Sequence, residues 1–163
     1  MKRKISVPEN FILDVDGVLT TGQFFYTKDG KSAKIFGPHD NDGIKLLNKL
    51  MKICTITADA RGIEITKKRV SEDMGLRLEL VSENERVSWF QKNFDLARTI
   101  YMGDGIYDAL VFNQVGYSIA PASAFYVARD NADFVTKARA GEGAVAEACL
   151  HIIKKFFKNN ENK

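Results

Sequence analysis

Short apolar runs rich in β-branched residues recur along the chain and alternate with segments in which hydrophobic residues lie three or four positions apart. The runs have the length of strands, and the segments between them have the spacing of one helix face. Strands that alternate with helices need crossover connections, which produce a parallel sheet covered by helices on both faces. The pattern therefore predicts an α/β fold. The expected strands are 11–15, 54–57, 76–81, 99–102 and 115–119, and the expected helical segments are 44–51, 63–70, 87–90 and 144–157.

One stretch near the N-terminus departs from this alternation. Residues 24–27 and 32–36 are two extended runs, and they flank the turn-forming segment 28–31. This arrangement predicts a β-hairpin, over about residues 22–37, inserted directly after the first core strand. Its aromatic residues make the hairpin too apolar to stand alone in water. It should therefore either pack against another surface of the assembly or fold onto its own domain.

The composition limits the domain organisation. With 163 residues, of which 45% are hydrophobic, the chain can bury one full-sized core but not two. We expect a single domain over residues 1–163, without a separate cap domain, that ends in a helix over about 143–158 and a polar tail. A net charge of +3, from 24 basic and 21 acidic residues spread along the chain, does not indicate nucleic-acid binding.

The cysteines and the apolar segments indicate the cellular compartment of the protein. Cys54 and Cys149 both lie in apolar stretches that are typical of buried positions, so a disulfide is possible but not needed, which fits a reducing cytoplasm. The apolar segment 11–15 is too short for a signal sequence, and no segment approaches the length of a membrane span. The sequence therefore predicts a cytoplasmic protein with no membrane partner.

Acidic residues stand at two of the predicted strand ends, which is where ligands bind in an open parallel sheet. Asp14 and Asp16 end the first strand, point the same way on extended backbone, and precede Gly17, which permits a sharp exit. Asp104 and Asp108 follow the strand 99–102. Each pair has an ordinary alternative, either a solvated strand end or helix capping. Together the two pairs could surround a hard cation such as Mg²⁺.

Two further residues are candidates for binding a phosphate. Thr57 ends the second strand, where a hydroxyl and the free backbone N–H groups of the next helix suit a phosphate oxygen, although it could equally be an N-cap. Arg86 is placed to offset the negative charge that a phosphate and several carboxylates bring together. A single arginine in the first turn of a helix is more often a solvated surface group.

These motifs, taken in order, resemble the four motifs of the haloacid dehalogenase superfamily, over nearly the whole chain. They are Asp-Val-Asp-Gly-Val-Leu-Thr at 14–20, Thr57, Arg86 and Gly-Asp-x-x-x-Asp at 103–108. The lack of a cap insertion, the hairpin, and segments 40–44 and 141–145 are more narrowly similar to the 3-deoxy-manno-octulosonate 8-phosphate phosphatase group. The resemblance implies a Rossmann-like parallel sheet and a homotetramer in which the hairpins pack together.

The resemblance also implies a mechanism and a set of site residues. Asp14 would attack phosphorus to give an aspartyl phosphate, and Asp16 would act as general acid to the leaving alcohol and then as base to water. Mg²⁺ would supply the electrostatic part together with the basic residue. The implied metal ligands are Asp14, the backbone carbonyl of Asp16, and Asp104, with Asp108 in support. The residues implied to bind the phosphoryl oxygens are Thr57 and Arg86.

The chain departs from the group at positions near the expected substrate end. Arg86 replaces the usual lysine, and arginine's planar fork is not interchangeable with an ammonium. Ala58 and Asp59 replace Gly-Arg, which adds an acid near the site, while Thr21 and Ala146 replace the usual Asp and Arg. The phosphoryl machinery is kept, but the identity of the sugar is left open.

Three functions are compatible with these observations. The first is a Mg²⁺-dependent phosphatase of a phosphorylated sugar acid, such as 3-deoxy-manno-octulosonate 8-phosphate or a nonulosonate 9-phosphate, in the supply of nucleotide-activated sugars for surface polysaccharide. The second is a phosphatase of another small phosphate ester, which the altered Ala58-Asp59 segment favours. The third is a non-catalytic partner of a sugar-nucleotide synthetase. Retention of both Asp14 and Asp16 argues against the third.

Overall fold

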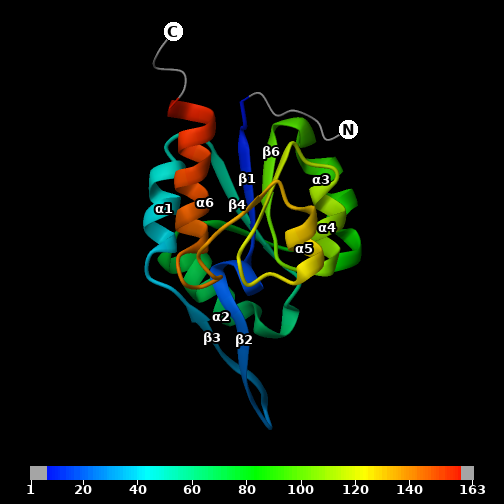
Figure 1. Cartoon of the computed structure of the whole chain (residues 1–163). Helices are drawn as coiled ribbons and strands as arrows, with labels where there is room; N and C mark the ends of the chain where they lie inside the picture. The colour runs from blue at the N-terminus through cyan, green and yellow to red at the C-terminus, as the bar shows by residue number, and fades with distance from the viewer. Residues whose placement is uncertain (1–6, 159–163) are drawn as a thin grey trace.

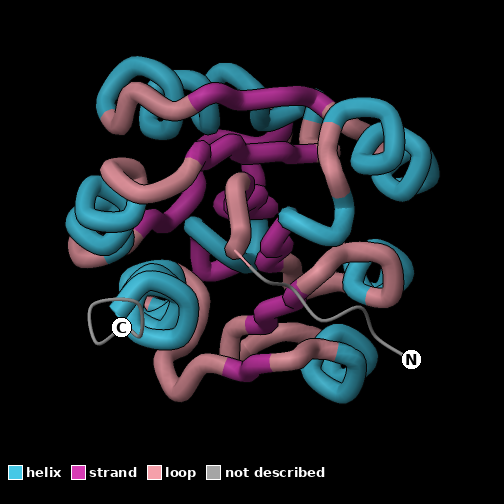
Figure 2. Tube along the Cα trace, turned by 90° about the horizontal axis from the view of Figure 1, so that it is seen from above, coloured by secondary structure: helices cyan, strands magenta, loops and turns pink. Residues whose placement is uncertain are grey.

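The first predicted strand lies in the middle of a six-stranded sheet, in which every strand pair is parallel (Figures 1 and 2). The computed structural model describes residues 7–158. The strand order is β5-β4-β1-β6-β7-β8. Strands covered on both faces can be apolar throughout, which is why the sequence showed continuous hydrophobic runs. The strands are β1 (Asn10–Asp14), β4 (Lys52–Thr57), β5 (Arg77–Leu80), β6 (Thr99–Met102), β7 (Tyr117–Ala120) and β8 (Phe134–Val135).

Helices cover both faces of this sheet, on either side of β1 (Figure 1). A turn at Val15–Leu19, with non-helical backbone angles at Asp16 and Gly17, follows β1, and a short helical turn at Glu83–Glu85 precedes α3. The helices are α1 (Asp40–Leu47), α2 (Ile63–Thr66, continued by a wider turn over Lys67–Asp73), α3 (Arg86–Asn93), α4 (Ile106–Phe112), α5 (Tyr126–Asn131) and α6 (Ala144–Ile152, continued over Ile153–Phe157).

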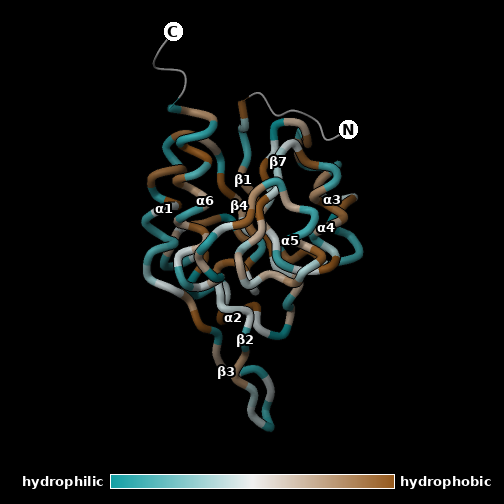
Figure 3. Tube along the Cα trace, viewed as in Figure 1, coloured by the Kyte–Doolittle hydropathy of each residue, from teal (hydrophilic) through white to brown (hydrophobic). Residues whose placement is uncertain are grey.

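The core is divided between the two faces of the sheet, and β1 supplies both halves. Phe11 and Leu13 pack in the cluster that includes residues of α1 and α6, whereas Ile12 packs in the cluster that includes residues of α3 and α4. This is the two-residue alternation of side chains along a strand. The most hydrophobic stretches accordingly run through the interior of the layered body (Figure 3). Cys54 and Cys149 are both buried and free, and they belong to opposite clusters.

The predicted α/β class is confirmed, with differences in the shorter elements. Neither β8 nor α5 was predicted, because a two-residue strand and a six-residue helix are too short to show a period. Helix α1 begins earlier than expected, at Asp40, and ends at Leu47. The hydrophobic residues Leu50 and Met51 therefore lie in the connection to β4 rather than on the helix.

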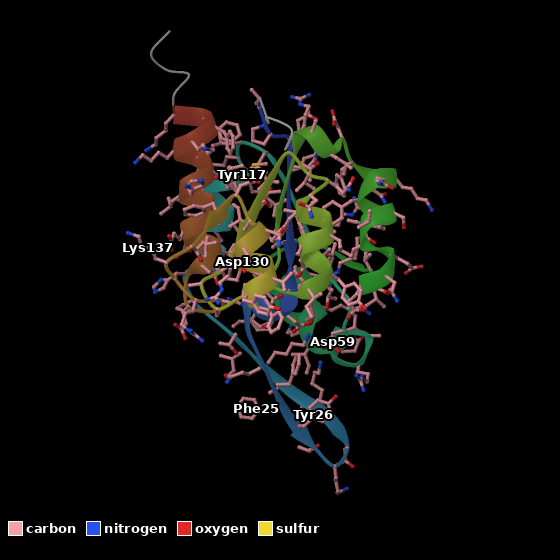
Figure 4. The ribbon with its side chains drawn as sticks, turned by 45° about the vertical axis from the view of Figure 1, so that its right-hand side comes forward. Phe25, Tyr26, Asp59, Tyr117, Asp130 and Lys137 are labelled. Carbon is pink, nitrogen blue, oxygen red and sulfur yellow. The ribbon has the colours of Figure 1, made fainter. Side chains whose placement is uncertain are left out.

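The predicted hairpin is confirmed as a separate two-stranded sheet directly after the first core strand. It consists of β2 (Thr20–Thr27) and β3 (Gly30–Phe36), which pair antiparallel and project from the body (Figure 1). The tip is hydrophilic (Figure 3), but Phe25 and Tyr26, next to it, are 56% and 58% exposed (Figure 4). These two aromatic side chains therefore do not pack onto the body, although Lys31, which pairs with Tyr26 on the opposite strand, contacts Asp59 of the body.

The C-terminal part of the chain packs its helix against α1. Ala146 of α6 lies so close to Gly43 of α1 that a Cβ atom added at Gly43 would be 2.6 Å from the Cα atom of Ala146. This contact gives the glycine at position 43 a structural reason. The expected polar tail lies mostly in residues 159–163, outside the described residues. Within residues 7–158, no helix combines the length and the apolar character that crossing a membrane requires.

Candidate active site

The chain turns sharply where β1 ends, and this turn places the first acidic pair. Asp14 is the last residue of β1, Asp16 lies in the turn, and Gly17 has a φ of 82°. A Cβ atom at Gly17 would lie 2.0 Å from Oδ2 of Asp104. Both the left-handed backbone and the close approach of Asp104 therefore require glycine at this position. The motif that follows β1 serves to bring two strand ends together.

Three carboxylates converge at this edge of the sheet. Asp14, Asp104 and Asp108 each offer an oxygen atom, and these atoms all lie within 4.8 Å of one another. Asp14 and Asp108 are buried and Asp104 is partly buried. Hard oxygen donors at this spacing fit a divalent cation such as Mg²⁺, and several anions held so close are otherwise unfavourable. The donor set therefore fits the metal that the sequence predicts.

Burial and mutual repulsion perturb two of these acids. Burial is the main cause that raises the pKa of Asp14 to about 7; Arg86 opposes this shift and the charge of Asp108 adds to it. Burial also raises the pKa of Asp104 to about 8, with Asp14 and Asp108 as the next contributors. Both values lie far above the ordinary carboxyl value of 3.8. Each acid therefore resists ionisation, and Asp14 does so even beside the guanidinium of Arg86.

These shifts predict an unusual pH dependence for the metal-free protein. Because the two folded-state pKa values are raised, the folded state holds these protons more tightly than the unfolded state, and stability should fall as the pH rises from about 4 to about 8. Mg²⁺ should reverse this fall, since it favours the ionised acids. Thermal unfolding at about pH 5.5 and about pH 8, in EDTA and in Mg²⁺, measures both effects. Asp104→Asn removes one of the two acids and should flatten the profile. A stability that rises with pH in EDTA would contradict the prediction.

Arg86 supplies the positive charge at the centre of the acidic cluster. It is the first residue of α3, and it is buried to 4% exposure. Its Nη1 and Nη2 atoms donate to the two carboxylate oxygens of Asp14, at 2.9 and 3.2 Å, and Nη1 also donates to Asp108. Burial lowers the pKa of Arg86, but Tyr101, Asp14 and Asp108 raise it more, so it stays charged. The surface alternative for this arginine is therefore wrong.

Asp108 is held from several sides and in turn holds the loop before α4. Its Oδ2 atom accepts hydrogen bonds from the backbone N–H groups of Asp104 and Gly105, at 2.9 and 2.8 Å. Its Oδ1 atom accepts from the hydroxyl of Tyr101 at 2.5 Å. The helix-capping alternative for Asp108 is therefore real, and it coexists with the place of Asp108 in the cluster. By bonding the N–H of Asp104, it fixes the loop that carries a second acid of the cluster.

Asp16 lies apart from the three clustered carboxylates and faces a lysine of the hairpin. Lys34 donates from Nζ to Asp16 Oδ2 at 2.9 Å and lies 2.8 Å from Oδ1. The hydroxyl of Thr57 donates to Asp16 Oδ2 at 3.2 Å and accepts from the backbone N–H of Asp59. Thr57 is buried, and its hydroxyl contacts the second acid of the motif. Its binding of a phosphate oxygen stays a prediction.

Asp59, expected only as an additional acid near the site, is neutralised by the hairpin. Its Oδ2 atom lies 2.5 Å from Nζ of Lys31 and 2.8 Å from Nζ of Lys34. Burial raises its pKa, but the two lysines outweigh burial and lower the pKa to about 2. Figure 4 shows Asp59 where the hairpin meets the body. Two lysines of β3 and two acids of the body thus form a compact charge-balanced group.

A cavity of about 470 Å³ opens over these groups. It brings together the side chains of four strand or helix ends and two residues of the hairpin, Phe24 and Lys31. The polar lining can accept a small anionic ligand beside a cation. Of the predicted site residues, all except Thr57 line it. The lining residues are Asp14, Asp16, Phe24, Lys31, Ala58, Asp59, Ala60, Arg61, Glu83, Arg86, Asp104, Gly105, Ile106, Tyr107 and Asp108.

Three contributors to the site were missed from the sequence. The Tyr101 hydroxyl accepts from Arg86 Nη1 at 3.0 Å, but a tyrosine within an apolar strand is typical of core and gives no signal. Lys31 and Lys34 lie on a hairpin whose direction relative to the sheet is not encoded in local pattern. Asp59, which contacts both lysines, was identified from the sequence as an additional acid near the site. The signal that could have found them is the need for a cation beside each unexplained acid.

Known proteins are similar to this chain in both sequence and fold. The chain is 32% identical to the 3-deoxy-D-manno-octulosonate 8-phosphate phosphatase of Escherichia coli, over 93% of this chain and 82% of that protein. The cobalt-bound form of the corresponding Haemophilus influenzae phosphatase superposes with a TM-score of 0.77 at 29% identity, over 90% of this chain and 88% of that one. The Moraxella catarrhalis phosphatase, solved with a magnesium ion, a phosphate ion and a KDO molecule, superposes with a TM-score of 0.80 at 24% identity, over 94% and 90%. No protein-family model matches the chain.

Proposed function

Because the chain belongs to the family of 3-deoxy-D-manno-octulosonate 8-phosphate phosphatases, within the haloacid dehalogenase superfamily, we propose that it is a Mg²⁺-dependent phosphatase of a phosphorylated sugar acid. The substrate would be 3-deoxy-manno-octulosonate 8-phosphate or a nonulosonate 9-phosphate. The observation that carries the proposal is the buried carboxylate of Asp14, which is paired with Arg86 and lies on the floor of a polar cavity. A nucleophile, a fixed cation and a cation-binding acid cluster meet there.

The proposed reaction has two steps. In the first, an oxygen of Asp14 bonds to phosphorus, the bond from phosphorus to the leaving alcohol breaks, and the carboxyl of Asp16 gives its proton to that oxygen. In the second, a water oxygen bonds to phosphorus, the bond to Asp14 breaks, and Asp16 takes a proton from the water. The buried guanidinium of Arg86 lies against Asp14, where it would stabilise the charge on the transferring phosphoryl group.

Mg²⁺ would be held by Asp14, the backbone carbonyl of Asp16 and Asp104, with Asp108 in support. When bound, the metal supplies charge stabilisation to the phosphoryl oxygens. The oxygen atoms of three of these acids within 4.8 Å of one another support the assignment. The Haemophilus influenzae relative in its cobalt-bound form also supports a divalent cation at this fold.

The substrate class is supported by the charge of the cavity rim. Arg61 is exposed and lines the cavity, and Lys31 lines it next to Phe24, whose ring centroid lies 3.6 Å from the lysine Nζ atom. Lys31 is already paired with Asp59, so the exposed guanidinium of Arg61 is the group of this lining that suits the carboxylate of a sugar acid. We propose a place in the supply of nucleotide-activated sugars for lipopolysaccharide, in the cytoplasm.

Phosphate release from a panel of sugar phosphates, with Mg²⁺ and with EDTA, tests the proposed function. We expect hydrolysis of an 8- or 9-phosphorylated sugar acid that depends on Mg²⁺. If the protein hydrolyses only other phosphate esters, the substrate is not a sugar acid, and the protein is a phosphatase of another small phosphate ester. Failure to hydrolyse any substrate, including an activated aryl phosphate, while Mg²⁺ binds normally would favour a non-catalytic partner of a sugar-nucleotide synthetase.

We also propose that the protein is a homotetramer assembled through the hairpin. Phe25 and Tyr26 are more than half exposed on its outer part (Figure 4), and a second apolar group is exposed beside the cavity. Exposed apolar surface of this kind marks an interface. The residues of the second group are Ile106, Tyr107, Leu110, Phe125 and Tyr126.

Substitution of the outer hairpin should therefore change the oligomeric state. The double variant Phe25→Ser and Tyr26→Ser removes apolar area without touching the described site, and we expect smaller particles in size-exclusion chromatography with light scattering. A matched control is Leu150→Ser, on an exposed position of α6 away from the hairpin. A wild-type protein that is monomeric at every concentration would contradict the proposal.

A further inference from the structure

The carboxyl of Asp16 is held in place mainly by one side chain. Asp16 lies in the turn after β1, outside any strand. The hydroxyl of Thr57 reaches one of its oxygens at 3.2 Å, which is a long contact. Nζ of Lys34 lies within 2.9 Å of both oxygens. Lys34 therefore makes the closest contacts to this carboxylate.

Lys34 is itself a fixed group and not a solvated surface lysine. Its side chain is 0% exposed, although it lies on the hairpin. Besides Asp16, its Nζ atom donates to the hydroxyl of Thr66 at 2.8 Å and lies 2.8 Å from Oδ2 of Asp59. An ammonium has three donors, and three oxygen-bearing side chains surround this one. A buried charge with every donor engaged has little freedom to move.

The partners of Lys34 are fixed in turn. Asp59 is held by Lys31 at 2.5 Å and accepts from the backbone N–H of Gly62 at 3.1 Å. A Cβ atom at Gly62 would lie 2.2 Å from Oδ2 of Asp59 and 2.9 Å from carbon atoms of both lysines. The side chains of this group therefore pack directly against the backbone of Gly62, which leaves no room for a methyl group on that side. The hairpin strand β3 is locked to the body at this point.

We propose that Lys34 is a positioning residue, which aims the carboxyl of Asp16 at the oxygen of the leaving alcohol. The inference rests on the proposed function, because Asp16 must be the proton donor for its aim to matter. A proton passes efficiently only over a short and aligned contact, so a loosely held Asp16 would slow the release of a basic alcohol. An aryl phosphate, whose leaving group needs no proton, would be released almost independently of Lys34.

The test compares two leaving groups in a single turnover. In Lys34→Gln with Mg²⁺, release of the alcohol from a sugar phosphate should slow by about 100-fold, while release of the phenol from an aryl phosphate should change by less than about threefold. Lys34→Arg keeps a cation that can reach the carboxylate and should restore part of the loss. Lys28→Gln, on the exposed tip of the same hairpin, is the matched control. Thermal unfolding of each variant checks that the fold is kept.

The outcomes separate this inference from the proposed function. An equal loss with both substrates would show that Lys34 only supports the fold, and an unchanged rate with both would show that Asp16 is aimed without it. Either result overturns the inference while the enzyme remains a phosphatase. A wild-type protein that releases neither leaving group would overturn the proposed function itself. If Lys34→Gln does not fold, Thr66→Val, which removes one anchor of the same ammonium, should show the same selective loss to a smaller degree.

Discussion

Asp14→Asn is expected to reduce phosphatase turnover by about 10⁴-fold or more and to leave the fold intact. The amide cannot form the bond to phosphorus on which both steps depend, and no described carboxylate can take its place without moving. Asp104 is held by its loop, whose N–H groups bond to Asp108, and Asp16 is held by Lys34. Phosphate release in Mg²⁺, measured over long incubations, gives the size of the loss.

The same substitution should not destabilise the protein, because it removes one of several crowded acids. The raised pKa of Asp14, at about 7, shows that its charge is not favourable in the metal-free site. We therefore expect the unfolding temperature in EDTA to stay the same or to rise. Asp42→Asn, at an exposed position of α1, is the control for a change of one charge. Substantial residual turnover in Asp14→Asn would show that another group is the nucleophile.

The sheet and its chemistry could be predicted from the sequence to different extents. The strands were found because the central ones are buried on both faces and contain uninterrupted apolar runs, as β1 and β6 do. Acids at the ends of such strands could be recognised because they interrupt apolar runs. The structure brings Asp14, Asp104 and Asp108 together as the parallel topology requires.

The contribution of the hairpin could not be predicted in the same way. The sequence of residues 31–34 does not show that the lysines of β3 face Asp16 and Asp59. Their direction depends on how the hairpin packs against the body. Thr57 was matched to the second motif of the superfamily by its position at the end of a strand. Its hydroxyl contacts Asp16, and this contact depends on the turn that carries Asp16. Sequence motifs therefore located the acids and the arginine that the structure brings together, whereas the lysines that contact these acids from the hairpin were found only through tertiary contacts.

Arg86→Ala is expected to have the second largest effect, on both activity and stability. The substitution leaves two buried acids, Asp14 and Asp108, without their shared cation. Breaking a buried pair in this way costs about 3–5 kcal/mol of folding free energy, and the loss of the cation near phosphorus should reduce kcat/KM by about 10²–10³-fold. Chemical denaturation and phosphate release measure the two effects on the same protein.

The destabilisation should depend on pH with a defined sign. Without Arg86, which lowers the pKa of both Asp14 and Asp104, these two pKa values rise further. The acids are then neutral at about pH 5, so the substitution costs less folding free energy there than at about pH 8.

Arg86→Lys keeps one charge but cannot reach both oxygens of Asp14 as the guanidinium does, so we expect it to retain more activity and stability than the alanine variant. Lys67 and Lys68 pair with Glu64 and Glu72 on exposed positions, and neither lines the cavity. An Arg86→Ala enzyme with unchanged KM and kcat would therefore move the basic role to another cation of the cavity lining, Lys31 or Arg61.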